Sequence, residues 1–135
     1  MTVLNWSRDL EVGIREIDVQ HRNLVAIANH LHDAILAGQA PQALSWILDE
    51  LALYTVHHFD AEEKLMQVHD FVESPQHHLE HKSMLKAVQR FHDRFGDGDA
   101  RVQRDVMDFL RGWLLQHIQG TDRKLAEELR QKGVR

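Results

Sequence analysis

Two spaced pairs of side chains in the middle of the chain have the chemistry of metal ligands. His58 stands four residues before Glu62, and His77 stands four residues before His81. On an α-helix, four residues advance about 40° beyond a full turn and climb about 6 Å, so both members of a pair lie on one face. Imidazole nitrogens and carboxylates on such a face suit zinc, iron or manganese, and a carboxylate can also bridge two ions.

Three further residues can join these pairs. His21 lies near the start of the expected first helix and His117 near the end of the expected fourth helix. Asp122 follows His117 by five residues, a spacing that places two side chains about 140° apart on an ideal α-helix. Gly120 between them can supply a break or a π-type turn that brings both to one point.

Composition limits the kinds of protein that this chain can be. Its 135 residues suffice for one domain with a sizeable core, and we expect that domain to span residues 1–135. The absence of cysteine excludes disulfides, iron–sulfur clusters and thiol catalysis, so a metal site must use His, Asp and Glu. A net charge of −5 argues against a nucleic-acid partner, and no signal peptide or membrane span is evident. We expect a soluble, cytoplasmic monomer.

Apolar periodicity predicts four long helices after an ordered arm at residues 1–17. Asp18 is the expected cap of the first helix and Gly38 its stop, while Pro41 suits the first turn of the second. The third helix follows Pro75 and ends before Gly96, the fourth starts near residue 100, and a short polar helix at residues 121–132 ends the chain. The inward stripe of the second helix contains Leu44, Ile47, Leu48, Leu51, Tyr54, Thr55, His58, Glu62 and Leu65.

Four helices with short connections predict an all-α fold, an antiparallel up-down-up-down four-helix bundle. In that topology the start of the first and third helices and the end of the second and fourth lie at one end of the bundle. The candidate ligands all fall at that end, on the inward stripes. The helical phase of these residues and their position along the bundle axis therefore both predict one shared site.

A single histidine on an apolar helix face is more often a hydrogen-bonded core residue than a metal ligand. Seven convergent groups are different, because without a metal several buried donors and acceptors would stay unpaired, at about 1–3 kcal/mol each. The six remaining histidines do not share this convergence, and His57 and His78 are expected at the surface or behind a ligand. These six are His30, His32, His57, His69, His78 and His92.

The ordered set of motifs resembles the hemerythrin family, and within it the single-domain bacteriohemerythrins. The resemblance spans nearly the whole chain, and it is specific because no ligand of the family pattern is missing. The matching segments are Ile17-Asp18-Val19-Gln20-His21, His58-Phe59-Asp60-Ala61-Glu62-Glu63 with Met66, His77 with His81, and Trp113-Leu114-Leu115-Gln116-His117-Ile118 with Asp122.

This resemblance implies a non-haem centre of two iron ions with an oxo or hydroxo bridge. His77, His81 and His117 would hold one iron, and His21 and His58 the other. Glu62 and Asp122 would bridge both. The iron with two histidines would keep an open position for dioxygen, and an apolar wall would protect the bound gas. By their position relative to the motifs, the residues of that wall are Leu24, Phe59, Trp113 and Ile118.

The ligand balance favours a reversible oxygen carrier over an enzyme. Ferritin-like di-iron oxygenases are rich in carboxylates, which support high-valent iron, whereas five imidazoles outnumber two carboxylates here. Related iron-repair proteins typically carry Glu where Asp122 stands. We therefore expect storage, transport or delivery of dioxygen without enzymatic activity. The alternatives are an oxygen or redox sensor that acts through a partner, and a di-iron oxidase or peroxidase.

Overall fold

The computed structural model describes residues 6–71, 74–99 and 101–135 of the chain, and within these ranges its regular elements are all helical. In chain order they are the 3₁₀-helix η1 (Arg8–Leu10), α1 (Arg15–Leu36), α2 (Ala40–Val68), α3 (Ser74–Gly96), α4 (Val102–Gln116), the π-helix η2 (His117–Asp122) and α5 (Arg123–Gln131).

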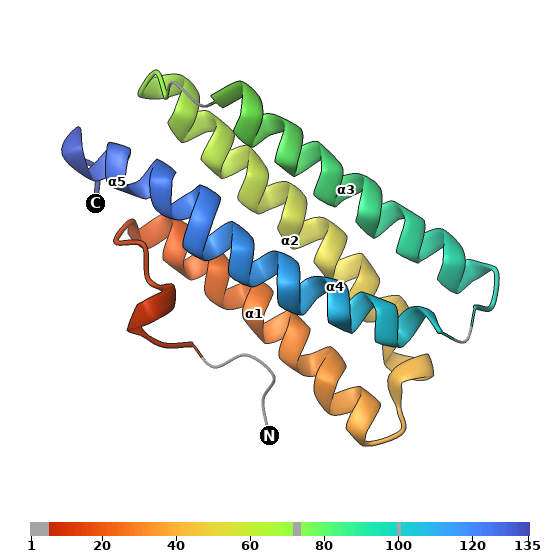
Figure 1. Cartoon of the computed structure of the whole chain (residues 1–135). Helices are drawn as coiled ribbons and strands as arrows, with labels where there is room; N and C mark the ends of the chain where they lie inside the picture. Colours follow the sequence, from red (N-terminus) through yellow and green to blue (C-terminus); the bar gives the residue numbers. More distant parts are fainter. Residues whose placement is uncertain (1–5, 72–73, 100) are drawn as a thin grey trace.

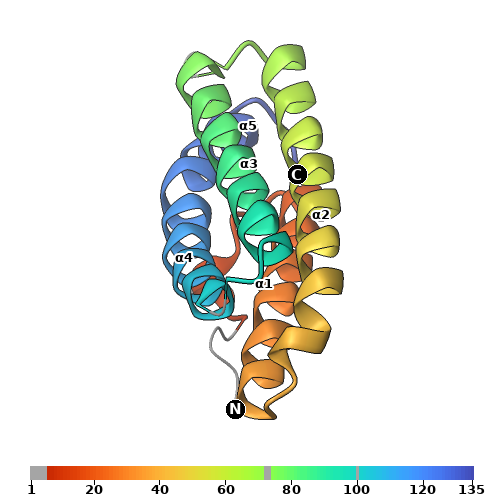
Figure 2. The same ribbon diagram turned by 90° about the vertical axis from the view of Figure 1, so that its right-hand side faces the viewer.

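The four long helices run up, down, up and down beside one another, which confirms the predicted bundle (Figure 1). The view turned by 90° shows how short the connections between neighbouring helices are (Figure 2). The start of α1, the end of α2, the start of α3 and the end of α4 meet at the end of the bundle that also carries α5. That end holds the candidate ligands.

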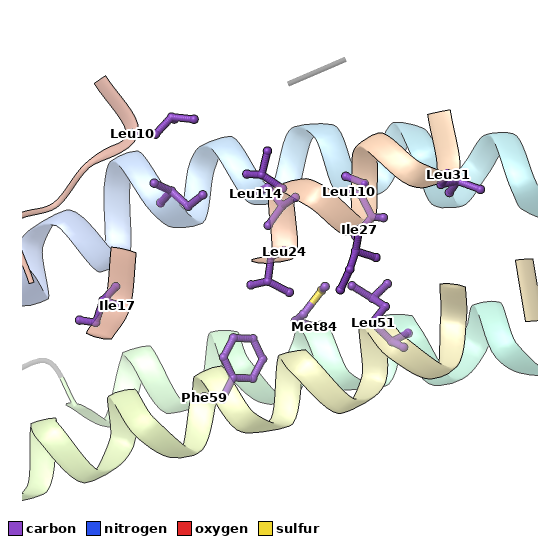
Figure 3. Packing of buried hydrophobic residues seen from close by; sticks show 14 of the residues in the cluster. Leu10, Ile17, Leu24, Ile27, Leu31, Leu51, Phe59, Met84, Leu110 and Leu114 are labelled. Carbon is purple, nitrogen blue, oxygen red and sulfur yellow. The ribbon is translucent and has the colours of Figure 1, made fainter. Parts of the chain in front are cut away.

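The predicted inward stripes form the core along the bundle axis. Leu24 of α1 points toward Phe59 of α2 and Met84 of α3, and each is at most 2% exposed (Figure 3). Their burial contributes about 1.5–3 kcal/mol per side chain before the cost of conformational entropy. This packing fixes the rotation of each helix about its axis, and so determines which polar side chains point inward at the ligand end.

The N-terminal arm packs on the domain, and it is shorter than predicted. Helix α1 begins at Arg15 after Ile14, so residues 15–17 are helical, while residues 1–5 of the predicted arm lie outside the described residues. Asp18 does not cap α1. Its carboxylate accepts hydrogen bonds from the backbone N–H groups of Val12 and Gly13, at 2.8 and 3.2 Å, and so fastens the arm to the helix.

The fourth helix changes from α- to π-helical geometry between His117 and Asp122, whose five-residue spacing does not suit an α-helix. Residues 117–122 form a π-helix, which confirms the predicted π-type turn between His117 and Asp122. Helix α5 continues in the same direction as α4 (Figure 1). The expectation of a polar tail is corrected, because Leu125, Ala126 and Leu129 are buried in the core cluster. In the part of the chain that the structure describes, no helix is both long and apolar enough to cross a membrane.

Candidate metal centre

All seven predicted ligands lie together inside the ligand end of the bundle. Each is at most 3% exposed, although all are polar or ionisable. They come from four segments: α1 provides His21; α2 provides His58 and Glu62; α3 provides His77 and His81; and η2 provides His117 and Asp122 at its two ends. Burying so many polar side chains in one place is costly unless they bind one another or a common ion.

The imidazoles of three segments point their Nε2 atoms at one oxygen of Asp122. The Oδ2 atom lies 2.5 Å from Nε2 of His21, 3.2 Å from Nε2 of His58 and 2.7 Å from Nε2 of His117. A carboxylate oxygen has two lone pairs, so three nitrogens around it are more than two ordinary hydrogen bonds would require. They are arranged as ligands are around a metal ion, where bonds of about 2.1 Å place neighbouring donor atoms about 3 Å apart.

Glu62 occupies the matching position for the histidines of α3. Its Oε1 atom lies 3.3 Å from Nε2 of His77 and 3.1 Å from Nε2 of His81. His77 also approaches Asp122 Oδ1, at 3.0 Å. Possible ligand atoms within 4.8 Å of one another therefore form two overlapping groups, each of five residues. One contains His21 and His58, the other contains His77 and His81, and both contain Glu62, His117 and Asp122.

The hydrogen bond of His58 provides a direct test of whether a cation fits. Its Nδ1–H donates to Oε1 of the buried Gln20 at 2.7 Å, so the neutral ring carries a lone pair on Nε2. That lone pair faces the carboxylate of Asp122 at 3.2 Å. Two acceptors in that position require a positive charge between them, either a proton or a metal ion.

Unpartnered polar atoms around the same point favour the metal. Among the described residues, Glu62 Oε2, Asp122 Oδ1 and His117 Nε2 are buried without a hydrogen bond. Each such atom costs about 1–3 kcal/mol. Metal coordination would use all three, so the site has the donor set and the unsatisfied valence that one or more transition-metal ions require.

Burial keeps the imidazoles of His58 and His81 neutral, which is the form that binds metal. It lowers the pKa of His58 from 6.5 to about 4, against the opposing attraction of Asp122. Burial, together with repulsion from His77 and His117, lowers the pKa of His81 to about 2. Protons therefore compete weakly for these two ligands at neutral pH.

The two carboxylates differ in acidity because their surroundings differ. Burial and the nearby charge of Asp122 raise the pKa of Glu62 well above 4.5. Burial acts in the same direction on Asp122, but the electrostatic attraction of the His117 ring and the hydrogen bond with His21 hold the pKa of Asp122 well below 3.8. In the absence of metal, a proton shared by the pair thus resides preferentially on Glu62 and the negative charge on Asp122, and a bound cation would favour the ionised form of Glu62.

Two of the predicted wall residues brace ligands of the second group. Phe59 stacks on His81 with ring centroids 3.7 Å apart, and Trp113 stacks on His117 with centroids 4.3 Å apart. Leu24 and Ile118 are at most 1% exposed and belong to the apolar core. All four candidates therefore lie in the packed interior near the ligands.

Several neighbours of the ligands were not identified from the sequence pattern. Gln20 is one, and it stands immediately before His21. Another is Glu63, whose carboxylate accepts a hydrogen bond from Nδ1 of the half-exposed His78. A third is the pair Glu80 and Thr121, which are joined by a hydrogen bond of 2.6 Å. The six histidines excluded from the prediction all lie outside the two ligand groups.

Comparison with known proteins finds the family that the sequence motifs resemble. The family model described as the hemerythrin HHE cation binding domain matches residues 12–129. The bacteriohemerythrin of Stenotrophomonas maltophilia is 34% identical over 130 residues, which cover 96% of this chain and 84% of that protein. The bacteriohemerythrin of Pseudomonas aeruginosa strain LESB58 is 36% identical over 134 residues, with the same coverage.

Solved structures agree with the sequence relatives. The crystal structure of wild-type hemerythrin superposes with a TM-score of 0.85 at 28% identity, over 94% of this chain and 98% of that one. A single-substitution variant of hemerythrin gives a TM-score of 0.87 at 28% identity, over 96% and 98% of the two chains. The fold is thus shared along nearly the full length of the chain.

Proposed function

Because the chain belongs to the hemerythrin family, we propose that it binds dioxygen reversibly at a non-haem centre of two iron ions, for storage, transport or delivery. The observation that carries this proposal is the pair of overlapping ligand groups, which share both carboxylates. One ion in each group, with Glu62 and Asp122 reaching both, uses every donor of the site.

The proposed ligand set follows the family pattern. His77, His81 and His117 would hold one iron and His21 and His58 the other, with an oxo or hydroxo group as a third bridge. His117 lies within reach of both groups, and its stacking on Trp113, on the side of Phe59 and His81, supports its place with the three-histidine group. Two ferrous ions would supply the two electrons that dioxygen accepts on binding and returns on release.

The protein's own residues would keep such a centre reversible. Five neutral imidazoles add no negative charge, so they stabilise high-valent iron less than carboxylates would. Gln20 holds the ring of His58 in the tautomer that leaves Nε2 free. We propose that the packed side chains of Leu24, Phe59, Trp113 and Ile118 exclude water from the open position, and so slow the protonation and loss of the bound gas.

Metal analysis of the reconstituted protein tests this proposal. We expect close to two irons per chain, and a loss of nearly all metal in the His77→Ala variant. One metal per chain, or zinc bound in preference to iron when iron is plentiful, would refute the di-iron assignment. Oxygen uptake that continues through many turnovers would favour the oxidase alternative.

A further inference from the structure

A cleft of about 180 Å³ leads from the surface to His77. It lies between α3, which contributes His77 and Glu80, and the π-helix region, which contributes Gly120, Thr121 and Lys124. A water molecule takes about 30 Å³ in the liquid, so the cleft has room for several. A ligand of the metal centre that is only 1% exposed is thus reached by a water-sized passage.

A second cleft, of about 230 Å³, also reaches the three-histidine group. It is lined by Trp113 and His117, and it shares Glu80 and Thr121 with the first cleft. The Thr121 hydroxyl donates to Oε2 of Glu80 at 2.6 Å, which fixes a carboxylate that lines both clefts. Both passages to the three-histidine group therefore pass the charge of Glu80.

Gly120 adds a second observation on the first cleft. Its φ is not in the left-handed region, and a Cβ built there meets no atom within 4 Å. Neither backbone conformation nor close packing therefore requires glycine, although glycine costs about 1 kcal/mol relative to alanine inside a helix. The missing side chain leaves open space at the side of the cleft.

We infer that the cleft between α3 and the π-helix is the route by which ferrous iron enters the centre, with Glu80 as the first carboxylate that the hydrated ion meets. This inference rests on the proposed iron site. The ion would exchange its waters stepwise for oxygen and nitrogen donors, from Glu80 at the mouth to His77 at the floor. Dioxygen gains nothing from a carboxylate, which is why the lining fits a cation better than the gas.

The opposite charges of Glu80 and Lys124 should have opposite effects on the rate of iron entry. Glu80 attracts a dication and Lys124, which lines the same cleft, repels it. Near a solvated surface, one unit charge changes the rate of dication entry by a few-fold, about three- to tenfold. Glu80→Gln should therefore slow iron loading and Lys124→Gln should accelerate it, and both effects should shrink at high salt.

The experiment mixes the metal-free full-length protein with ferrous ammonium sulfate without oxygen. Free iron is trapped with ferrozine at timed intervals, and protein-bound iron is counted. Glu80→Gln is expected to load about three- to tenfold more slowly than the wild type but to the same final content. Glu127→Gln on α5 and Lys86→Gln on α3 are matched controls at exposed positions outside the cleft, and they should load at the wild-type rate.

A plug variant tests the passage without changing charge. Gly120→Leu puts a side chain into the open space and should also slow loading, whereas Gly112→Leu, at an equally open position on α4, should not.

Equal rates in wild type, Glu80→Gln, Lys124→Gln and Gly120→Leu would overturn the entry route while leaving the iron site intact. A lower final content in Glu80→Gln would also overturn it, by making Glu80 part of the site. A wild-type protein that takes up no iron would overturn the proposed function itself.

Discussion

The proposed two-histidine group (His21 and His58) and the proposed three-histidine group (His77, His81 and His117) are supported by the protein in different ways. His58 donates its outer N–H to Gln20 inside the protein, at 2.7 Å. His77 and His117 instead line clefts that reach the surface, and aromatic rings stack on His81 and His117. One group is held by a hydrogen bond within the core and the other by ring packing beside solvent. The difference suits a centre that must keep one position protected and still load its metal.

The largest expected effect comes from removing what the two groups share. Glu62 is fully buried and belongs to both, so Glu62→Ala should empty both iron positions together instead of one. It should also destabilise the iron-loaded fold, by about 3–5 kcal/mol, because the bound cations lose a buried anionic partner. Metal analysis and thermal unfolding measure the two effects. Asp60→Ala, at an exposed position two residues earlier, is the matched control. A variant that kept one tightly bound iron would show that Glu62 does not bridge.

Acid should affect both groups, because each contains a histidine with a lowered pKa. The unfolded chain binds protons at His58 and His81 below about pH 6.5, while the folded chain resists until about pH 4 at His58 and about pH 2 at His81. The free energy of unfolding therefore falls as the pH drops from 6.5 to 4. The raised pKa of Glu62 acts in the opposite direction above pH 4.5, which makes the fall shallower than the about 2.7 kcal/mol per pH unit that the two histidines alone would give.

Urea unfolding of the metal-free protein at several pH values measures that slope. In the loaded protein, protons also displace iron from the imidazoles, so iron should be lost over the same range. Equal iron retention at pH 4 and pH 7 after equilibrium dialysis would count against ligation by five imidazoles.

Leu24 sharpens the comparison on the side of the two-histidine group. Leu24→Ala should leave about two irons per chain but speed conversion to the ferric form, because water gains access near the open position. The lost packing should cost about 2–5 kcal/mol. Leu31→Ala, at an equally buried position of α1 further along the core, should cost a similar amount and leave the autoxidation rate unchanged. Identical half-lives in the two folded variants would remove Leu24 from the proposed wall.

The smallest effect is expected at Gln20, which acts through His58. Gln20→Ala removes the acceptor of the Nδ1–H group and should weaken iron binding by about 10- to 100-fold at the two-histidine position only. Gln20→Glu, which also accepts that hydrogen bond, should restore it, and Gln42→Ala at an exposed position of α2 should change nothing. Nitrogen chemical shifts of His58 in the metal-free protein report its tautomer. An unchanged tautomer in Gln20→Ala would exclude this positioning role.

The convergence of the seven candidate ligands could be predicted because spacing, helical phase and chain direction all restrict where they lie. Even the irregularly spaced pair His117 and Asp122 could be predicted from the sequence, because Gly120 lies between them and five residues match one turn of a π-helix. The role of Gln20 could not be predicted, because a single glutamine on a helix has no distinctive sequence pattern. Its contact with His58 depends on how α1 and α2 pack together.

Local signals misled where tertiary contacts override them. Asp18 has the residue type of a helix cap, but its carboxylate binds the backbone of the arm and α1 begins three residues earlier. The last helix has a polar composition, yet the spacing of Leu125, Ala126 and Leu129 gives it one apolar face that the core buries.

The absorption spectrum of the purified, iron-loaded protein tests the central claim most directly. The reduced protein should gain visible colour on exposure to oxygen and lose it when oxygen is removed, over repeated cycles, with two irons per chain throughout. A protein that consumes oxygen without a persistent oxygenated spectrum, or whose spectrum does not respond to oxygen at all, would contradict reversible binding at this centre.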